Sequence, residues 1–207
     1  MDNYISFKEH LLGIKQNKIT CVWWLNIGIE QIWSATEGDP IIPRLSIRES
    51  DNIASKSEQM CLMIADHNDI VILKDRIPLM VTESLKTAGL SLPEVWVLPE
   101  NDKETQASIS EIVLKNCDIM GRLSSLNQKS GNIFLTPYAA TSADQEIANQ
   151  TGCRIIGASP EAVIWTNNKI NARLLAIESG LPVTEGFICK SVEEILLGIE
   201  RLRGCGS

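Results

Sequence analysis

Two cations lie one helical turn apart in the segment NNKINARLLAIESGLPV, residues 167–183. Lys169 falls in the first turn of the predicted helix and Arg173 follows at i+4, so both lie on one edge of it. Their mutual repulsion and the repulsion of a cation by the positive helix terminus each cost about a few tenths of a kcal/mol. A bound anion would reverse both effects, because free backbone N–H groups and the lysine would point at it. The spacing therefore predicts an anion site, and two solvated surface cations are the alternative.

The helix that carries these cations is expected to pack on a core. Its apolar residues recur at i, i+4 and i+7, which places three of them on one stripe: Ile170, Leu174 and Ile177. Asn167 is the predicted N-cap, and Gly180 is predicted to end the helix before Pro182, which cannot continue it.

A second set of candidate residues follows two predicted strands. Asn26, Gly28 and Glu30 come after strand 19–25, while Thr136, Pro137 and Tyr138 come at the end of strand 132–136. Open parallel sheets bind ligands outside the carboxyl ends of their strands, at the topological switch point. With the strand order 3-2-1-4-5 these two loops would flank that crevice and form a substrate site. Ordinary loop chemistry is the alternative, with Gly28 supplying a turn and Tyr138 keeping its hydroxyl in water.

The elements that must position these residues alternate between two patterns. Five short, continuously apolar segments are predicted strands: 19–25, 69–73, 94–98, 132–136 and 153–157. Amphipathic segments are predicted helices near 5–15, 54–66, 78–88, 105–127 and 143–151. The alternation indicates right-handed parallel crossovers, hence an α/β fold with a Rossmann-like, doubly wound parallel sheet of about five strands. Residues 34–52 are expected to form a long loop of functional or mobile character.

The pattern changes after residue 157. Ser159 and Pro160 suit the start of a short helix, residues 184–189 (TEGFIC) resemble a strand, and Ser191 with Glu194 predicts a capping box for a last helix. We therefore expect a domain at 1–158 and the first elements of a second, incomplete unit at 159–207.

Composition narrows the class of protein. The 207 residues carry a formal charge of −7, and the pI near 4.9 argues against a nucleic-acid partner. The longest apolar runs are too short to cross a bilayer, and the first ten residues lack the layout of a signal peptide, so no membrane association is expected. Six scattered cysteines without a C-x-x-C motif indicate a reduced, cytoplasmic protein, and with only two histidines no metal site is expected.

Several common functions of an open α/β sheet lack their motifs here. No G-x-G-x-x-G follows the first predicted strand, and neither a P-loop sequence nor a G-x-S-x-G nucleophile elbow occurs. The sequence therefore does not predict a dinucleotide-binding dehydrogenase, a P-loop nucleotidase or an α/β-hydrolase.

A family resemblance connects the cations with the strands. The run IIGASPEAVIWTNNKINARLLAIESGLPVTEGF, residues 155–187, resembles the junction between the pre-ATP-grasp domain and the ATP-grasp fold. There a G-x-[SP]-P-E element precedes a D-K-x-x-x-[RK] helix that ends in G-[LIV]-P-[VT]-x-x-G. Upstream, residues 136–157 look like the last crossover of the leading domain. Residues 21–33 (CVWWLNIGIEQIW) resemble its first strand and loop in carboxylate–amine ligases of the peptide-ligase type.

This resemblance implies a function for the cationic helix. In the family, the lysine at the position of Lys169 reaches the nucleotide phosphates, and Arg173 occupies a variable basic position. Asn168 stands where an aspartate is usual. These enzymes bind ATP and Mg²⁺, phosphorylate a small-molecule carboxylate, and let an amine attack the acyl phosphate. Family members often pair through their leading domains, so a homodimer is also an expectation.

The remaining ATP-grasp motifs lie downstream in the family, and nothing after Ser191 resembles them. The chain is therefore expected to lack the C-terminal ATP-grasp lobe and to be inactive alone, so whether it is itself an enzyme stays open. A stand-alone, non-catalytic pre-ATP-grasp module for ligand binding or subunit association is the first alternative. An unrelated flavodoxin-like binder of a small ligand is the second.

Overall fold

The computed structural model describes residues 19–27, 29, 56–99 and 107–204, and every structural statement below concerns these residues. The chain divides into two compact units, residues 1–160 and 161–207, and each is described by itself. The predicted helix near 5–15 and the predicted loop 34–52 lie outside the described residues.

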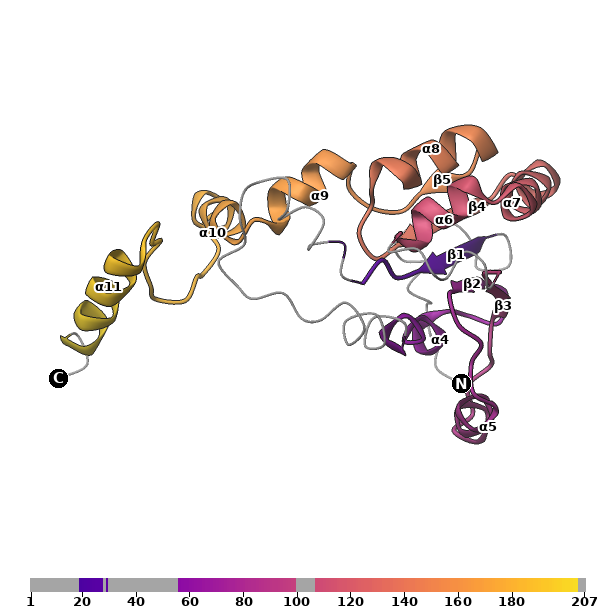
Figure 1. Ribbon diagram of the computed structural model, residues 1–207, viewed down its shortest axis with the longest axis horizontal. Coiled ribbons are helices and arrows are strands. Elements are labelled where there is room, and N and C mark those ends of the chain that lie inside the picture. Colours follow the sequence, from indigo (N-terminus) through magenta and orange to yellow (C-terminus); the bar gives the residue numbers. More distant parts are fainter. Residues whose placement is uncertain (1–18, 28, 30–55, 100–106, 205–207) are drawn as a thin grey trace. The chain divides into compact units, whose positions relative to one another are not determined.

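The first unit is built on a five-stranded parallel sheet (Figure 1). Its strands are β1 (Thr20–Trp24), β2 (Ile70–Leu73), β3 (Glu94–Val97), β4 (Ile133–Pro137) and β5 (Arg154–Ile155). They lie in the order β3-β2-β1-β4-β5 and every neighbouring pair is parallel. The predicted α/β fold and the strand order assumed for the crevice are thus confirmed, with β1 and β4 at the switch point.

The strands form where apolar residues run without interruption, because helices cover both faces of the sheet. On one face Val22, Trp24 and Leu135 belong to the larger core, which packs on α6 (Ile109–Lys115), α7 (Cys117–Ser130) and α8 (Ser142–Thr151). On the other face Val71 and Leu73 pack on α4 (Cys61–Ile64), and Leu85 of α5 (Leu79–Thr87) adds to this smaller core. Alternate side chains of β1, β2, β3 and β4 therefore lie in different cores, whereas β5 adds only Ile155 to the larger core and its Arg154 is exposed.

The predicted helix near 105–127 is wrong as one element, because the chain breaks it at Asn116. The backbone of Asn116 is extended, so it ends α6, and its side chain accepts a hydrogen bond from the Ile119 N–H at 3.1 Å, which caps α7. An asparagine that satisfies one free helix donor favours this restart over a continuous helix.

The buried carboxylate of Asp69 joins β1 to the start of β2. Its Oδ1 accepts a hydrogen bond from the Cys21 N–H at 2.9 Å, and its Oδ2 accepts bonds from the Trp23 indole N–H and the Asp66 N–H at 2.9 and 3.0 Å. A carboxylate is a stronger hydrogen-bond acceptor than a neutral group, so these bonds fix β1 and β2 against each other.

Replacing Asp69 by Ala should lower the free energy of unfolding by about 3 kcal/mol, because buried N–H donors lose their acceptor. Asp69→Asn keeps one acceptor oxygen and should lose less. Urea unfolding of the three proteins measures this order. Equal stability of Asp69→Ala and the original protein would show that the carboxylate does not hold the strands.

The second unit contains α10 (Lys169–Glu178), α11 (Val192–Gly204) and most of α9 (Pro160–Asn167). The N-cap of α10 is Asn168, so the predicted cap Asn167 is one residue off. Asn168 Oδ1 accepts hydrogen bonds from the N–H groups of Ile170 and Asn171 at 3.0 and 3.4 Å. Gly180, with φ of 69°, ends the helix as predicted.

Two further expectations for this unit fail. Residues 184–189 form no strand, since no other strand occurs among the described residues of the unit to pair with them. The apolar stripe of α10 is not buried: Ile170, Leu174 and Ile177 are 40%, 43% and 49% exposed. Within 161–204 only Gly198 is buried, so the described part of this unit has no core of its own.

None of the helices among the described residues has the length and apolar character of a membrane span.

The capping box predicted for α11 is present in altered form. The Glu194 N–H donates to Ser191 Oγ at 3.2 Å, as expected. Its carboxylate, however, accepts from the Lys190 N–H at 2.6 Å, one residue before the predicted donor.

Candidate functional site

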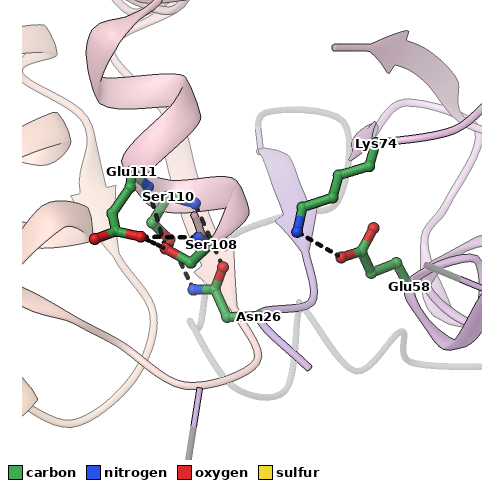
Figure 2. Close-up of polar contacts among 6 residues, drawn as sticks. All are labelled: Asn26, Glu58, Lys74, Ser108, Ser110 and Glu111. Carbon is green, nitrogen blue, oxygen red and sulfur yellow. Dashed lines mark hydrogen bonds and ion pairs between the residues drawn. The ribbon is translucent and has the colours of Figure 1, made fainter. Parts of the chain in front are cut away.

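The predicted substrate residue Asn26 lies at the carboxyl end of β1 with its side chain turned inward (Figure 2). It is 3% exposed. Its amide donates to Ser110 Oγ at 2.7 Å and to the Ala139 carbonyl at 3.5 Å, and its Oδ1 accepts from the Ser110 N–H at 3.4 Å. Every polar atom of this side chain therefore has a partner within the protein.

Ser110 links Asn26 to a buried carboxylate. It lies in the first turn of α6, where the Ser108–Glu111 capping box fixes the start of the helix (Figure 2). Its hydroxyl donates to Asp144 Oδ1 and accepts from the Trp24 indole N–H at 3.0 Å. One hydroxyl thus serves one acceptor and two donors, which is its full capacity.

Asp144 is the centre of the network. The Trp24 indole N–H also donates to its Oδ1 at 3.1 Å, and the N–H and hydroxyl of Thr141 donate to its Oδ2, both at 2.7 Å. Thr141 and Asp144 form the capping box of α8, so one carboxylate begins a helix and joins it to β1 and α6. Burial raises the pKa of Asp144, and the bonds from Ser110, Thr141 and Trp24 oppose that rise.

The network occupies the switch point of the sheet, where the sequence predicted a crevice. Asn26 shapes the loop from inside rather than offering its amide to a ligand. The side chains that hold it, Ser110 and Asp144, were not among the predicted site residues. The S-x-x-E and T-x-x-D capping patterns indicate the two helix starts, but they give no sign that these starts meet at β1.

The other predicted substrate residues have different surroundings. Gly28 and Glu30 lie outside the described residues. Thr136 and Tyr138 are at the same sheet edge as Asn26, because Trp23 pairs with Thr136 in the ladder and the Tyr138 N–H donates to the Trp24 carbonyl at 3.0 Å. Thr136 is half-buried with its hydroxyl 3.5 Å from the Phe134 carbonyl, whereas the Tyr138 side chain is 57% exposed. The structure therefore brings Asn26, Thr136 and Tyr138 together, and Tyr138 is the one open to solvent.

Replacing Ser110 by Ala should lower the free energy of unfolding by about 2–3 kcal/mol. The change leaves buried donors of Asn26 and Trp24 without one acceptor and removes a donor from Asp144. Ser84→Ala is the matched control, since the Ser84 hydroxyl bonds to the Met80 carbonyl at 2.8 Å on the exposed surface of α5. Chemical denaturation compares the two variants, and an equal, small loss in both would contradict the network's importance.

The second candidate site is a cleft in the second unit. It has a volume of about 580 Å³ and lies between α10, α11 and the segment that joins them. Its lining is mostly apolar, with two cations and one thiol: Lys169, Ile170, Arg173, Phe187, Ile188, Cys189, Ile195, Gly198, Ile199 and Leu202.

The two cations of this cleft have different roles. The Arg173 guanidinium donates to the carbonyls of Thr184 and Gly186 at 2.8 and 3.2 Å, so it holds the connecting segment against α10. The Lys169 ammonium contacts Asn167 Oδ1 at 3.1 Å on the exposed surface. Two backbone carbonyls therefore engage one nitrogen of Arg173, Nη2, while the exposed Lys169 ammonium contacts one amide oxygen and is accessible to an anion.

The backbone donors of this helix start are also in use. The sequence suggested that free backbone N–H groups at this helix start would face an anion. Instead, the N–H groups of Ile170 and Asn171 donate to the Asn168 side chain. The charge of Lys169, rather than these donors, is what the cleft offers to an anion. Among the residues that the structure describes, no group of three or more His, Cys, Asp or Glu side chains is placed to hold a metal ion.

Comparison with known proteins returned no match: no family model, no curated protein and no solved structure is significantly similar to this chain.

Proposed function

We propose that this chain contributes a Rossmann-like domain and a phosphate-contacting lysine to an ATP-dependent carboxylate–amine ligase. The resemblance of residues 155–187 to the ATP-grasp junction motivates the proposal. The observation that carries it is the contrast within the cleft, where Arg173 is bound by two carbonyls and Lys169 keeps an exposed ammonium. A nucleotide phosphate is the anion that Lys169 would contact.

The proposed reaction assigns this chain a limited part. A carboxylate attacks the γ-phosphorus of ATP, the bond to the β–γ bridging oxygen breaks, and ADP leaves. An amine then attacks the carbonyl carbon of the acyl phosphate, the bond from that carbon to the phosphate oxygen breaks, and the amide forms as phosphate and a proton leave. Lys169 would hold a phosphate group and neutralise part of its negative charge. This would lower the activation barrier of phosphoryl transfer, because negative charge develops in the transition state. Bound Mg²⁺ would supply further neutralisation. No described cluster in this chain is suited to hold the metal, so other elements would have to provide its ligands.

The first unit would contribute the substrate side of the reaction. Thr136 and exposed Tyr138 lie at the β1–β4 edge, and the Asn26 network keeps that edge in shape. A hydroxyl and a phenol can both bind a substrate carboxylate or amine. This role rests on position at the switch point, where open α/β sheets bind ligands.

Replacing Lys169 by Ala in the full-length protein should weaken ATP binding by about 1.5–3 kcal/mol, or roughly ten- to hundredfold in Kd. Isothermal titration calorimetry with Mg-ATP measures this change. Arg203→Ala is the matched control, because it removes one exposed cation of the same unit outside the cleft and should leave the affinity unchanged. Unchanged ATP affinity in Lys169→Ala would remove this lysine from the nucleotide site.

A non-catalytic binding module is the second candidate, and the exposed apolar surface of the second unit discriminates between the two. The stripe of α10 and the side chains Ile195, Leu196 and Leu197 of α11 are largely exposed. A unit that belongs to a larger ATP-binding lobe should associate through this surface when it is left uncovered.

The 207-residue chain on its own should therefore self-associate and bind a hydrophobic dye. Sedimentation analysis and dye fluorescence test this expectation. A monodisperse, stable chain that binds no dye would favour the stand-alone module over the ligase.

A further inference from the structure

A third buried carboxyl group, after those of Asp69 and Asp144, lies at the carboxyl end of β2 and apart from the Asn26 network (Figure 2). Glu58 belongs to a helical turn before α4, and its side chain is 2% exposed. Its Oε1 lies 4.0 Å from the ammonium of Lys74, the first residue after β2. Its Oε2 accepts no hydrogen bond from the residues that the structure describes. Because β2 neighbours β1 in a parallel sheet, this pair lies on the same sheet edge as the predicted substrate loops.

The two members of this pair differ in their access to water. The Lys74 side chain is 25% exposed, so its ammonium can stay hydrated, whereas the Glu58 carboxyl group cannot. An ion pair at 4.0 Å with one unsatisfied oxygen compensates poorly for the desolvation of a carboxylate. The buried position of Glu58 therefore favours the protonated, neutral form of its side chain over the carboxylate.

Together, burial and the charged groups around Glu58 also favour its neutral form. Burial is the largest effect and raises the pKa of Glu58 to about 7; the Lys74 charge and backbone N–H oppose the rise, and the Asp75 charge adds to it. Cys61, on the adjoining α4, has its thiol pKa raised to about 12 by burial, so it stays neutral throughout the physiological range.

We propose that Glu58 is a proton-controlled anchor, which holds residues 56–64 on the carboxyl end of β2 firmly when it is protonated and loosely when it is ionised, and that the contact with Lys74 partly offsets the cost of the ionised form. Opening this segment exposes Glu58 to water, where it ionises at its ordinary pKa of 4.5. The closed form thus binds the proton more tightly than the open form. The stabilisation of the closed form by the proton on Glu58 is complete below pH 4.5 and is lost as the pH rises through about 7.

The first experiment compares urea unfolding of the 207-residue chain at pH 6 and pH 8, at a protein concentration at which sedimentation shows a monomer. The unfolding constant of the original protein should rise about tenfold more over this interval than that of Glu58→Gln, which is neutral at both values. The contribution of Asp144, whose raised pKa acts in the same direction, is common to both proteins and cancels in the comparison. Glu83→Gln, the same change at an exposed position of α5, should behave like the original protein. Parallel pH dependence in the original protein and Glu58→Gln would overturn the proposal.

A second measurement does not depend on the folding of a variant. Carboxyl carbon NMR of the folded original protein should show Glu58 titrating with a midpoint near 7, and amide exchange of residues 61–64, corrected for intrinsic rates, should quicken from pH 6 to pH 8. In Lys74→Met the midpoint should rise further, because an attractive charge is lost. A Glu58 midpoint near 4.5, or a midpoint that Lys74→Met leaves unchanged, would refute the contact.

Discussion

The buried carboxylate of Asp144 imposes the constraint on which the first unit depends. A charged or polar group in the interior is tolerated only when its hydrogen-bonding capacity is filled. Thr141, Ser110 and Trp24 fill it, and they come from the start of α8, the start of α6 and the end of β1. Three elements must therefore meet at one place. Asn26 also belongs to this junction through Ser110, and its fixed position sets the loop at the switch point.

The edge of the sheet holds two polar clusters with opposite properties. In the Asn26 network each buried donor and acceptor has a partner, so the network is rigid and has no capacity left for a ligand. In the Glu58–Lys74 pair one oxygen is unsatisfied and the cation reaches water, so the energy of the pair depends on a proton. The Asn26 network thus stabilises the carboxyl end of the sheet, and the Glu58–Lys74 pair makes it sensitive to pH.

The second unit follows a different principle from the first. Helix α10 has a cap and an end of its own, Asn168 and Gly180, but among residues 161–204 only Gly198 is buried. Local signals are therefore enough to begin and end α10. They do not produce a core, because a core forms only where several elements pack their apolar faces together. Arg173 shows how the unit keeps its shape instead, through a side chain that binds two carbonyls of the connecting segment.

Sequence patterns alone were enough to predict the class of fold and the five strands, because continuously apolar segments can be stable only when both faces of a sheet are covered. The sequence also identified Lys169 and Arg173 as an unusual pair of cations, and the family resemblance gave the phosphate contact to Lys169 while leaving Arg173 at a variable basic position. Only the tertiary structure revealed the partners of Arg173, since the carbonyls of Thr184 and Gly186 lie 11 and 13 residues beyond it and no periodicity predicts their approach. The same holds for Asn26 and Ser110, which are 84 residues apart. Helix starts and strands are local properties of the chain, whereas the partner of a buried polar group is decided by which elements pack together.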